Sequence, residues 1–201
     1  MKQRIDNTTC QLGKLAEEVR QCRACAKFLP HGVRPVIQVS ANAQVLIAGQ
    51  APGRKVHASG MPFDDASGDR LRDWMGIDRQ QFYNPDQVAI LPMGFCFPGS
   101  GERGDLPPRP ECAPLWRSKL LALMPNTKLT LVIGTHATKY YFPSHKASLT
   151  ALVRQVGSHP AGQMVLPHPS PRNNIWLKKN PWFQAKVLPE LKRRVKAALQ
   201  A

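Results

Sequence analysis

The chain has 201 residues, of which 42% are hydrophobic, and this is enough for one domain with a substantial core. Lys and Arg number 28 against 13 Asp and Glu, a formal net charge of +15 that attracts polyanions, with nucleic acid as the first candidate. No run approaches the roughly 18 apolar residues of a membrane span, and the N-terminal segment lacks the apolar block of a signal peptide. We therefore expect a cytoplasmic protein without a membrane partner, and its size suits a monomer.

The order of the expected elements indicates the fold class. A helical pattern in residues 1–20 comes first, and four short apolar segments then have the character of buried parallel strands: 43–49, 87–93, 129–134 and 162–167. Between them lie helical patterns in 67–77 with Ser67 as a candidate N-cap, 110–124, 135–142 and 146–156; a last helix is expected from Asn180 as cap and Pro181 as first position. Strand and helix alternate, which predicts a single α/β domain over 1–201, with a central four-stranded parallel sheet flanked by helices.

In such a sheet, ligands bind beyond the carboxyl ends of the strands. The glycine- and proline-rich loops of this chain all follow strands, so we expect them to converge at one edge. Basic side chains flank these loops, and they favour a nucleic-acid-binding face over an evenly solvated surface: Arg54, Lys55, Arg103, Arg109, Arg172, Lys178 and Lys179.

Four of the five cysteines form a pattern typical of a metal site. Cys22 and Cys25 make a C-x-x-C, and Cys96 and Cys112 lie 16 residues apart with a loop between them. Disulfides are not expected in a cytoplasmic protein, and four thiolates suit either zinc or an iron–sulfur cluster. The spacing by itself does not choose between these two, and Cys10 is left over as a structural residue.

The cysteine pattern resembles that of the iron–sulfur (family 4) uracil-DNA glycosylases, which have a C-x-x-C near the N-terminus and two further cysteines spaced like Cys96 and Cys112. The resemblance implies a 4Fe–4S cluster on Cys22, Cys25, Cys96 and Cys112, with zinc as the alternative. Such a cluster would tie the N-terminal helix to the long loop, a structural role that needs no redox chemistry.

A glycine-rich turn follows the first expected strand and reads "GQAPG", residues 49–53. Glycines let the backbone approach a ligand closely, and the G-x-G-x-x-G and G-K-[ST] spacings of nucleotide loops are missing. The turn resembles the first motif of the uracil-DNA glycosylase superfamily, which lines the base pocket. The resemblance implies base contacts from Gly49, Ala51, Pro52 and Gly53, and stacking of the base on Phe63.

A rigid loop follows the last strand and reads "HPSPRN", residues 168–173. It is similar to the second superfamily motif, in the form found in single-strand-selective monofunctional uracil-DNA glycosylases. There the histidine contacts a carbonyl oxygen of the base, so His168 is expected to stabilise the anionic leaving base, and Arg172 to fill the gap in the stack. The expected DNA contacts are Arg54, Lys55, Ser170, Arg172 and Asn173.

Two positions depart from the family pattern. Gln50 stands where family 4 carries glutamate, and Ala51 stands where the classical enzymes carry the aspartate that orients the water. Asp64 and Asp65 are the nearest substitutes for this carboxylate, although either could instead cap the helix near Ser67.

The second departure concerns the base. The asparagine that reads uracil in the family is missing before Cys96, so Met93 or the backbone groups of Gly94 and Phe95 are expected to line that side of the pocket. This leaves the target base open among uracil, hypoxanthine, xanthine and 5-hydroxymethyluracil, with uracil first.

The resemblance implies a monofunctional DNA glycosylase of base excision repair, acting on single- or double-stranded DNA with His168, Gln50, Asp64 and Asp65 as candidate catalytic residues. No lysine lies in the pocket motifs, so a Schiff-base lyase step is not expected. The alternative is a non-catalytic iron–sulfur DNA-binding protein that recognises lesions or ends, which the missing carboxylate and asparagine would suit.

Overall fold

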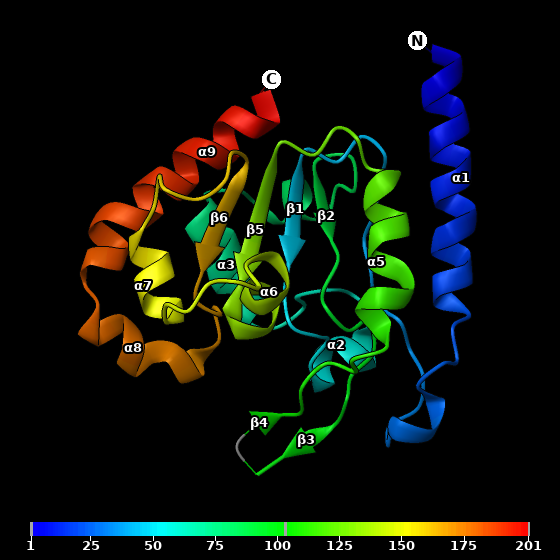
Figure 1. Ribbon diagram of the computed structural model, residues 1–201, viewed down its shortest axis with the longest axis horizontal. Helices are drawn as coiled ribbons and strands as arrows, with labels where there is room; N and C mark the ends of the chain where they lie inside the picture. The colour runs from blue at the N-terminus through cyan, green and yellow to red at the C-terminus, as the bar shows by residue number, and fades with distance from the viewer. Residues whose placement is uncertain (1, 103, 201) are drawn as a thin grey trace.

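The computed structural model describes residues 2–102 and 104–200, and in it strands and helices alternate around a single parallel sheet (Figure 1). The strands of this sheet are β1 (Val45–Ala48), β2 (Val88–Ile90), β5 (Leu129–Ile133) and β6 (Gln163–Leu166). The α-helices are α1 (Lys2–Arg20), α2 (Arg54–Ser59), α3 (Ala66–Met75), α4 (Arg79–Phe82), α5 (Cys112–Ala122), α6 (Gly134–Tyr141), α7 (Leu149–Arg154), α8 (Asn174–Lys179) and α9 (Leu188–Gln200). Shorter elements are the 3-10 turns Ala26–Phe28 and Pro171–Asn173, a π-helical turn Phe183–Val187, and the hairpin β3 (Ser100–Gly101) and β4 (Gly104–Asp105).

The sheet has the order β2-β1-β5-β6, and every neighbouring pair is parallel. Val45 pairs with Val88 on one side and with Leu129 on the other. All four strands fall inside the segments predicted from the sequence, so the expected α/β fold with a four-stranded parallel sheet is confirmed. The strands are nearly continuous runs of buried apolar residues because helices cover both faces.

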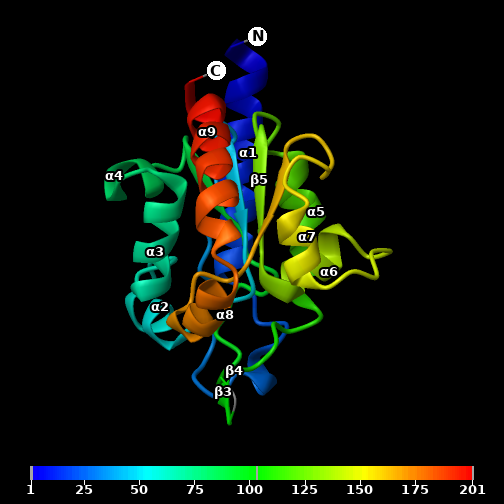
Figure 2. The same ribbon diagram turned by 90° about the vertical axis from the view of Figure 1, so that its left-hand side faces the viewer.

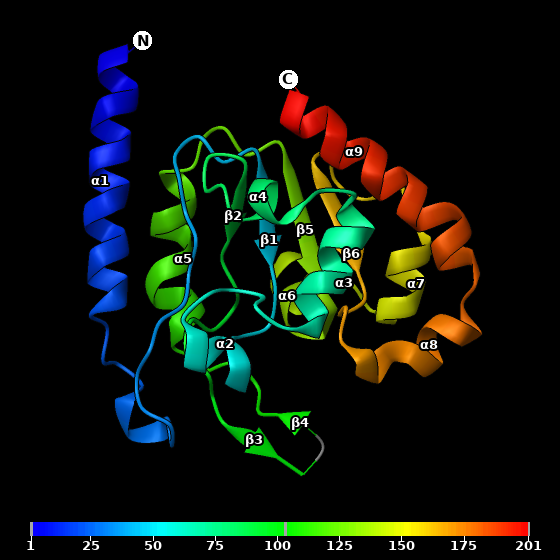
Figure 3. The same ribbon diagram turned by 180° about the vertical axis from the view of Figure 1, so that it is seen from behind.

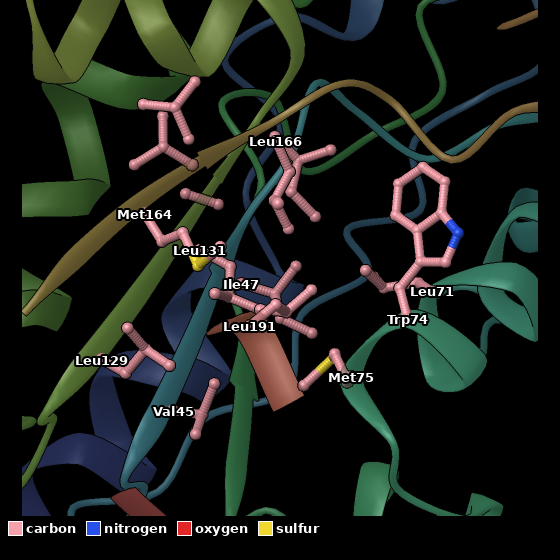
Figure 4. Close-up of a cluster of buried hydrophobic side chains, with 14 of the residues drawn as sticks. Val45, Ile47, Leu71, Trp74, Met75, Leu129, Leu131, Met164, Leu166 and Leu191 are labelled. Carbon is pink, nitrogen blue, oxygen red and sulfur yellow. The ribbon is translucent and has the colours of Figure 1, made fainter. Parts of the chain in front are cut away.

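Helices α3 and α9 lie on one face of the sheet, and α5, α6 and α7 lie on the other (Figures 2 and 3). The larger core cluster joins Ile47 and Leu131 of the sheet to Trp74 of α3 and Leu191 of α9 (Figure 4). Each of these side chains is at most 4% exposed. This packing holds the strands rigidly, and their carboxyl ends therefore form a fixed platform for the loops.

Helix α1 packs against α5 at the outer edge of the molecule (Figure 1). Leu12 and Val19 of α1 belong to a second buried cluster that also contains Leu120 of α5 and Leu91 beyond β2. None of the helices among the described residues is sufficiently long and apolar to cross a bilayer.

Two predicted helix starts differ from the structure. Helix α3 is capped by Asp65, whose side chain accepts hydrogen bonds from the amides of Ser67 and Gly68, and not by Ser67 itself. The C-terminal helical segment is not one continuous α-helix: Phe183–Val187 form a π-helical turn before α9, and Pro189 has no N–H to donate to the carbonyl of Ala185 as a continuous α-helix would require.

Candidate functional site

A pocket of about 440 Å³ lies beyond the carboxyl ends of the strands, where the loops after β1, β2 and β6 meet. It brings together most of the residues predicted for the base-binding and catalytic site: Gly49, Gln50, Ala51, Pro52, Gly53, Phe63, Asp65, His168, Ser170, Arg172 and Asn173. Asp64, Met93, Arg54 and Lys55 are not among its lining residues.

His168 is held in one orientation by its own loop. Its Nδ1 accepts a hydrogen bond from the backbone N–H of Ser170 at 3.2 Å, so the neutral ring carries its proton on Nε2. Burial lowers the pKa of His168, while the charges of Asp65 and Asp105 act in the opposite direction. At neutral pH the ring is therefore an uncharged donor into the pocket.

The loop around His168 is anchored by three further hydrogen bonds. Asn173 donates from its Nδ2 to the carbonyl of His168 at 2.7 Å, a hydrogen bond between two residues of the same loop. Arg70 of α3 donates to the carbonyl of Ser170 at 3.1 Å and to Oδ1 of Asn174 at 2.8 Å. Buried prolines 167 and 169 flank the histidine, so the loop has little freedom to reorganise.

Phe63 takes a backbone conformation that is rare outside glycine, with φ of 55°. Gly68 leaves room for this conformation because it has no side chain. A Cβ at that position would overlap the carbonyl oxygen of Phe63. The ring sits against the first motif, since a Cβ on Gly49 would lie 3.7 Å from its Cζ, and it packs edge-on against Phe82. Strained backbone of this kind clusters at ligand sites, and here it places an aromatic ring in the pocket wall.

The two adjacent aspartates have different surroundings. Asp64 forms an ion pair with Arg79 at 3.1 Å, away from the lining of the pocket. Asp65 lines the pocket and uses Oδ1 to cap α3 at 2.9 and 3.0 Å, while its Oδ2 has no hydrogen-bond partner among the described residues. Asp65 therefore combines the two roles that the sequence presented as alternatives, a helix cap and a pocket carboxylate.

Gln50 and Met93 connect neighbouring loops. Gln50 donates its Nε2 to the carbonyl of Leu106 at 3.1 Å, so the first motif is tied to the long loop between the last two cysteines. Met93 is only 4% exposed, and its backbone N–H bonds the carbonyl of Gly49 at 2.9 Å. Its side chain belongs to the hydrophobic core, and Pro92 and Ile90 line that side of the pocket instead.

Several lining residues were missed by reasoning from the sequence: Val36, Val56, Pro62, Ser67, Ile90, Pro92, Gly104 and Asp105. The most important is Asp105, a second carboxylate in the pocket, on strand β4. The sequence does contain a signal for Asp105, because this residue lies in the loop after β2, which is expected to reach the same edge of the sheet. The pairing of β3 with β4 could not be predicted, because these short strands lack the alternation of apolar and polar residues that indicates a strand.

Basic groups lie at the same end of the sheet as the pocket. Arg54 and Lys55 are exposed on α2, and Lys178 and Lys179 are exposed on α8, two helices that lie at the same end of the sheet as the β3–β4 hairpin (Figure 1). Arg172 is exposed and packs against Gly104, so it bridges the His168 loop and the hairpin. Of the remaining two predicted basic groups, Arg109 pairs with Glu111 at 2.6 Å, and Arg103 lies outside the described residues.

Cys22, Cys25, Cys96 and Cys112 line one further pocket, between the end of α1 and the start of α5. All four are half-buried free thiols. No group of three or more His, Cys, Asp or Glu side chains in the described ranges is arranged around a common metal position. Cys10 is exposed on α1, so its predicted structural role is wrong.

N–H donors point at sulfur atoms of this pocket. The indole of Trp116 donates to Sγ of Cys22 at 3.4 Å, and the amide of Phe95 donates to Sγ of Cys112 at 3.4 Å. Burial raises the pKa of Cys96 to about 11 and that of Cys112 to about 12, and the charges of the other cysteines add to both shifts. Four neighbouring thiols beside N–H donors, with the pKa values of Cys25, Cys96 and Cys112 raised chiefly by burial, are a donor set that a bound cation would convert to thiolates.

Comparison with known proteins places these features in a family. Residues 36–192 match the uracil DNA glycosylase superfamily, a range that includes all the residues lining the pocket around His168. The type-4 uracil-DNA glycosylase of Sulfurisphaera tokodaii is 26% identical over 152 residues, which cover 73% of this chain and 64% of that protein. The protein of the same name from Saccharolobus solfataricus is 26% identical over 202 residues, covering 94% of this chain and 87% of the relative.

Proposed function

Because the chain belongs to the uracil-DNA glycosylase superfamily, we propose that it is a monofunctional DNA glycosylase that hydrolyses the N-glycosidic bond of a flipped base, with uracil as the first candidate. The observation that carries the proposal is His168, a neutral histidine fixed by Ser170 with its Nε2–H available in a pocket at the carboxyl end of the sheet. We place this glycosylase activity in base excision repair as part of the same proposal.

The arrangement suits the charge that develops when the bond breaks. The departing base takes up negative charge on its carbonyl oxygens, and a fixed donor aimed at that oxygen stabilises the transition state more than the ground state. His168 would be this donor, and the ring of Phe63 would stack on the flipped base. Gly49 to Gly53 would let the backbone approach the base closely.

The remaining chemistry is that of hydrolysis rather than a lyase. No lysine is among the lining residues in the described part of the chain, which supports a water nucleophile over a Schiff base. Asp65 would stabilise the positive charge on the sugar, because it lines the pocket and its Oδ2 has no hydrogen-bond partner among the described residues. Gln50 would act by fixing the first motif to the long loop. We do not assign Asp64 or Met93 a contact with the base, since neither lines the pocket.

The partner is proposed to be DNA, held by the basic rim. Arg54, Lys55, Lys178 and Lys179 would contact phosphates on the two sides of the pocket, with Ser170 and Asn173 in the loop between them. Arg172, at the mouth, would fill the space that the flipped nucleotide leaves. Binding should therefore weaken steeply with salt, because each neutralised phosphate releases counterions.

Cys22, Cys25, Cys96 and Cys112 would hold a 4Fe–4S cluster, which fits four thiols that line one pocket beside N–H donors. When bound, the cluster would supply a cross-link between the end of α1 and the loop that leads to α5, so that residues 1–201 behave as one domain. Iron and acid-labile sulfide analysis of the purified protein tests this directly. A brown protein with about four irons per chain is expected, and a colourless protein with one zinc would support the alternative metal.

The function is tested with labelled oligonucleotides that each carry one uracil, hypoxanthine, xanthine or 5-hydroxymethyluracil, in single- and double-stranded form. The cluster-loaded protein should leave an abasic site that hot alkali cleaves, with uracil the preferred base. Salt-sensitive binding to the same oligonucleotides without cleavage at any base would contradict the proposal and support a non-catalytic DNA-binding protein.

A further inference from the structure

We propose that Asp105, on the hairpin between the third and fourth cysteines, is the carboxylate that positions the hydrolytic water. This inference rests on the proposed glycosylase function and assigns the role that Ala51 leaves open in the first motif. The residue comes from a different loop, so the role is filled from across the pocket and not along the chain.

The hairpin presents Asp105 to the first motif in a defined orientation. Asp105 pairs with Ser100 across the two strands, and its Oδ1 accepts a hydrogen bond from Oγ of Ser100 at 3.2 Å. Its Oδ2 lies 3.3 Å from the position that a Cβ on Gly53 would occupy. The carboxylate therefore approaches the backbone of the first motif two residues beyond Ala51, in space that exists because residue 53 is glycine.

The hairpin is fixed to both motifs of the pocket. Gln50 bonds the carbonyl of Leu106, the residue directly after Asp105, at 3.1 Å. The guanidinium of Arg172 lies against Gly104, the residue directly before it. With both neighbours held, Asp105 stays at the mouth of the pocket, where its exposed side chain meets the solvent that supplies the water.

The other two acidic candidates are less suited to hold a water at this position. Asp64 is engaged with Arg79 and does not line the pocket. Asp65 uses Oδ1 to accept from the amides of Ser67 and Gly68, so its side chain is fixed at the start of α3 and only one carboxylate oxygen remains free. The two carboxylates would therefore have separate roles, with Asp65 stabilising the positive charge on the sugar and Asp105 holding the water beside the first motif.

In the step proposed, the C1′–N bond breaks and its electron pair goes to the base, whose oxygen receives a hydrogen bond from Nε2–H of His168. The oxygen of the water forms the new bond to C1′, and Asp105 accepts one of its protons. That proton then passes through solvent to the base anion. The products are the free base and an abasic deoxyribose, with atoms and charge balanced.

The test compares Asp105→Asn with Glu102→Gln, a matched control that removes a carboxylate from the same hairpin. Asparagine retains an oxygen that accepts from Ser100, so the variant should fold with an unchanged melting temperature. The single-turnover rate of uracil excision by Asp105→Asn should fall by about 10²–10⁴-fold, the usual contribution of a general base. Its affinity for an oligonucleotide with non-hydrolysable 2′-fluoro-deoxyuridine should stay close to that of the wild type, and Asp105→Glu should recover part of the rate.

The outcomes separate this inference from the function on which it rests. If the wild type excises a base and Asp105→Asn excises it equally fast, Asp105 has no catalytic role although the function stands. Equal losses in Asp105→Asn and Glu102→Gln would also overturn the inference, because they would show a general charge effect of the hairpin. A wild type that excises no base contradicts the proposed function and the role of Asp105 together.

Discussion

The most exacting structural prediction concerns Gly68, in the first turn of α3. In an ordinary helix, replacing glycine with alanine stabilises the protein by about 0.5–1 kcal/mol. At Gly68 the new Cβ would overlap the carbonyl oxygen and approach the Cβ of Phe63, whose φ of 55° leaves no easy way to move. Overpacking of this kind costs typically 1–3 kcal/mol, so we expect Gly68→Ala to lose about 1–2 kcal/mol net.

The same substitution in a matched position should have the opposite sign. Gly13 is an exposed glycine inside α1 with nothing within 4 Å of its added Cβ, so Gly13→Ala should raise the free energy of unfolding by about 0.5–1 kcal/mol. Urea unfolding of the two variants and the wild type measures both changes. Because Phe63 would be pushed from the pocket wall, Gly68→Ala should also lose excision activity while Gly13→Ala keeps it. Equal stabilisation by both substitutions would refute the steric account of Phe63.

Three further outcomes are expected. Arg117→Met should destabilise the protein by about 2–4 kcal/mol in urea unfolding, because the fully buried guanidinium bonds the carbonyls of Leu91 and Pro92, and the substitution leaves them without a donor. Arg70→Ala should lower the rate of excision about tenfold with a smaller effect on DNA affinity, because it frees the loop that carries His168. The free energy of unfolding should fall as the pH drops below about 6.5, the usual pKa of a histidine. Burial lowers the pKa values of His136, His159 and His168, so below this pH the unfolded chain binds more protons than the folded one. Unfolding curves at pH 7.5 and 5.5 measure this, and His168→Gln should reduce the difference; an unchanged difference would show that His168 does not contribute.

The fold could be predicted from the sequence because its strongest signals are local. Apolar runs such as 45–48 and 129–133 are buried on both sides, and the turn residues around them mark their ends. The cap of α3 could not be settled in this way, because Asp65 and Ser67 are both good capping residues, and only the structure shows that the Asp65 side chain accepts from the amides of Ser67 and Gly68.

The candidate site divides along similar lines. His168 and Gly49 to Gly53 stand in short motifs beside strand ends, so their convergence follows from the parallel sheet. The position of Asp105 depends on a hairpin of two short strands. Gln50 and Arg172 contact this hairpin from segments far away in the sequence. Met93 was predicted at the pocket because of its place in the chain, yet the core takes its side chain. Such choices between neighbouring surfaces depend on tertiary packing, which a linear pattern does not contain.

The most direct test of the central claim is the single-turnover rate of uracil excision by His168→Ala beside the wild type, with DNA affinity measured in parallel. Removal of a donor aimed at the leaving oxygen should lower the rate by about 10²–10³-fold. The affinity should change little and keep its salt dependence, because the basic rim is intact. A variant that excises uracil as fast as the wild type would contradict the role of His168, and with it the account of how this pocket breaks the glycosidic bond.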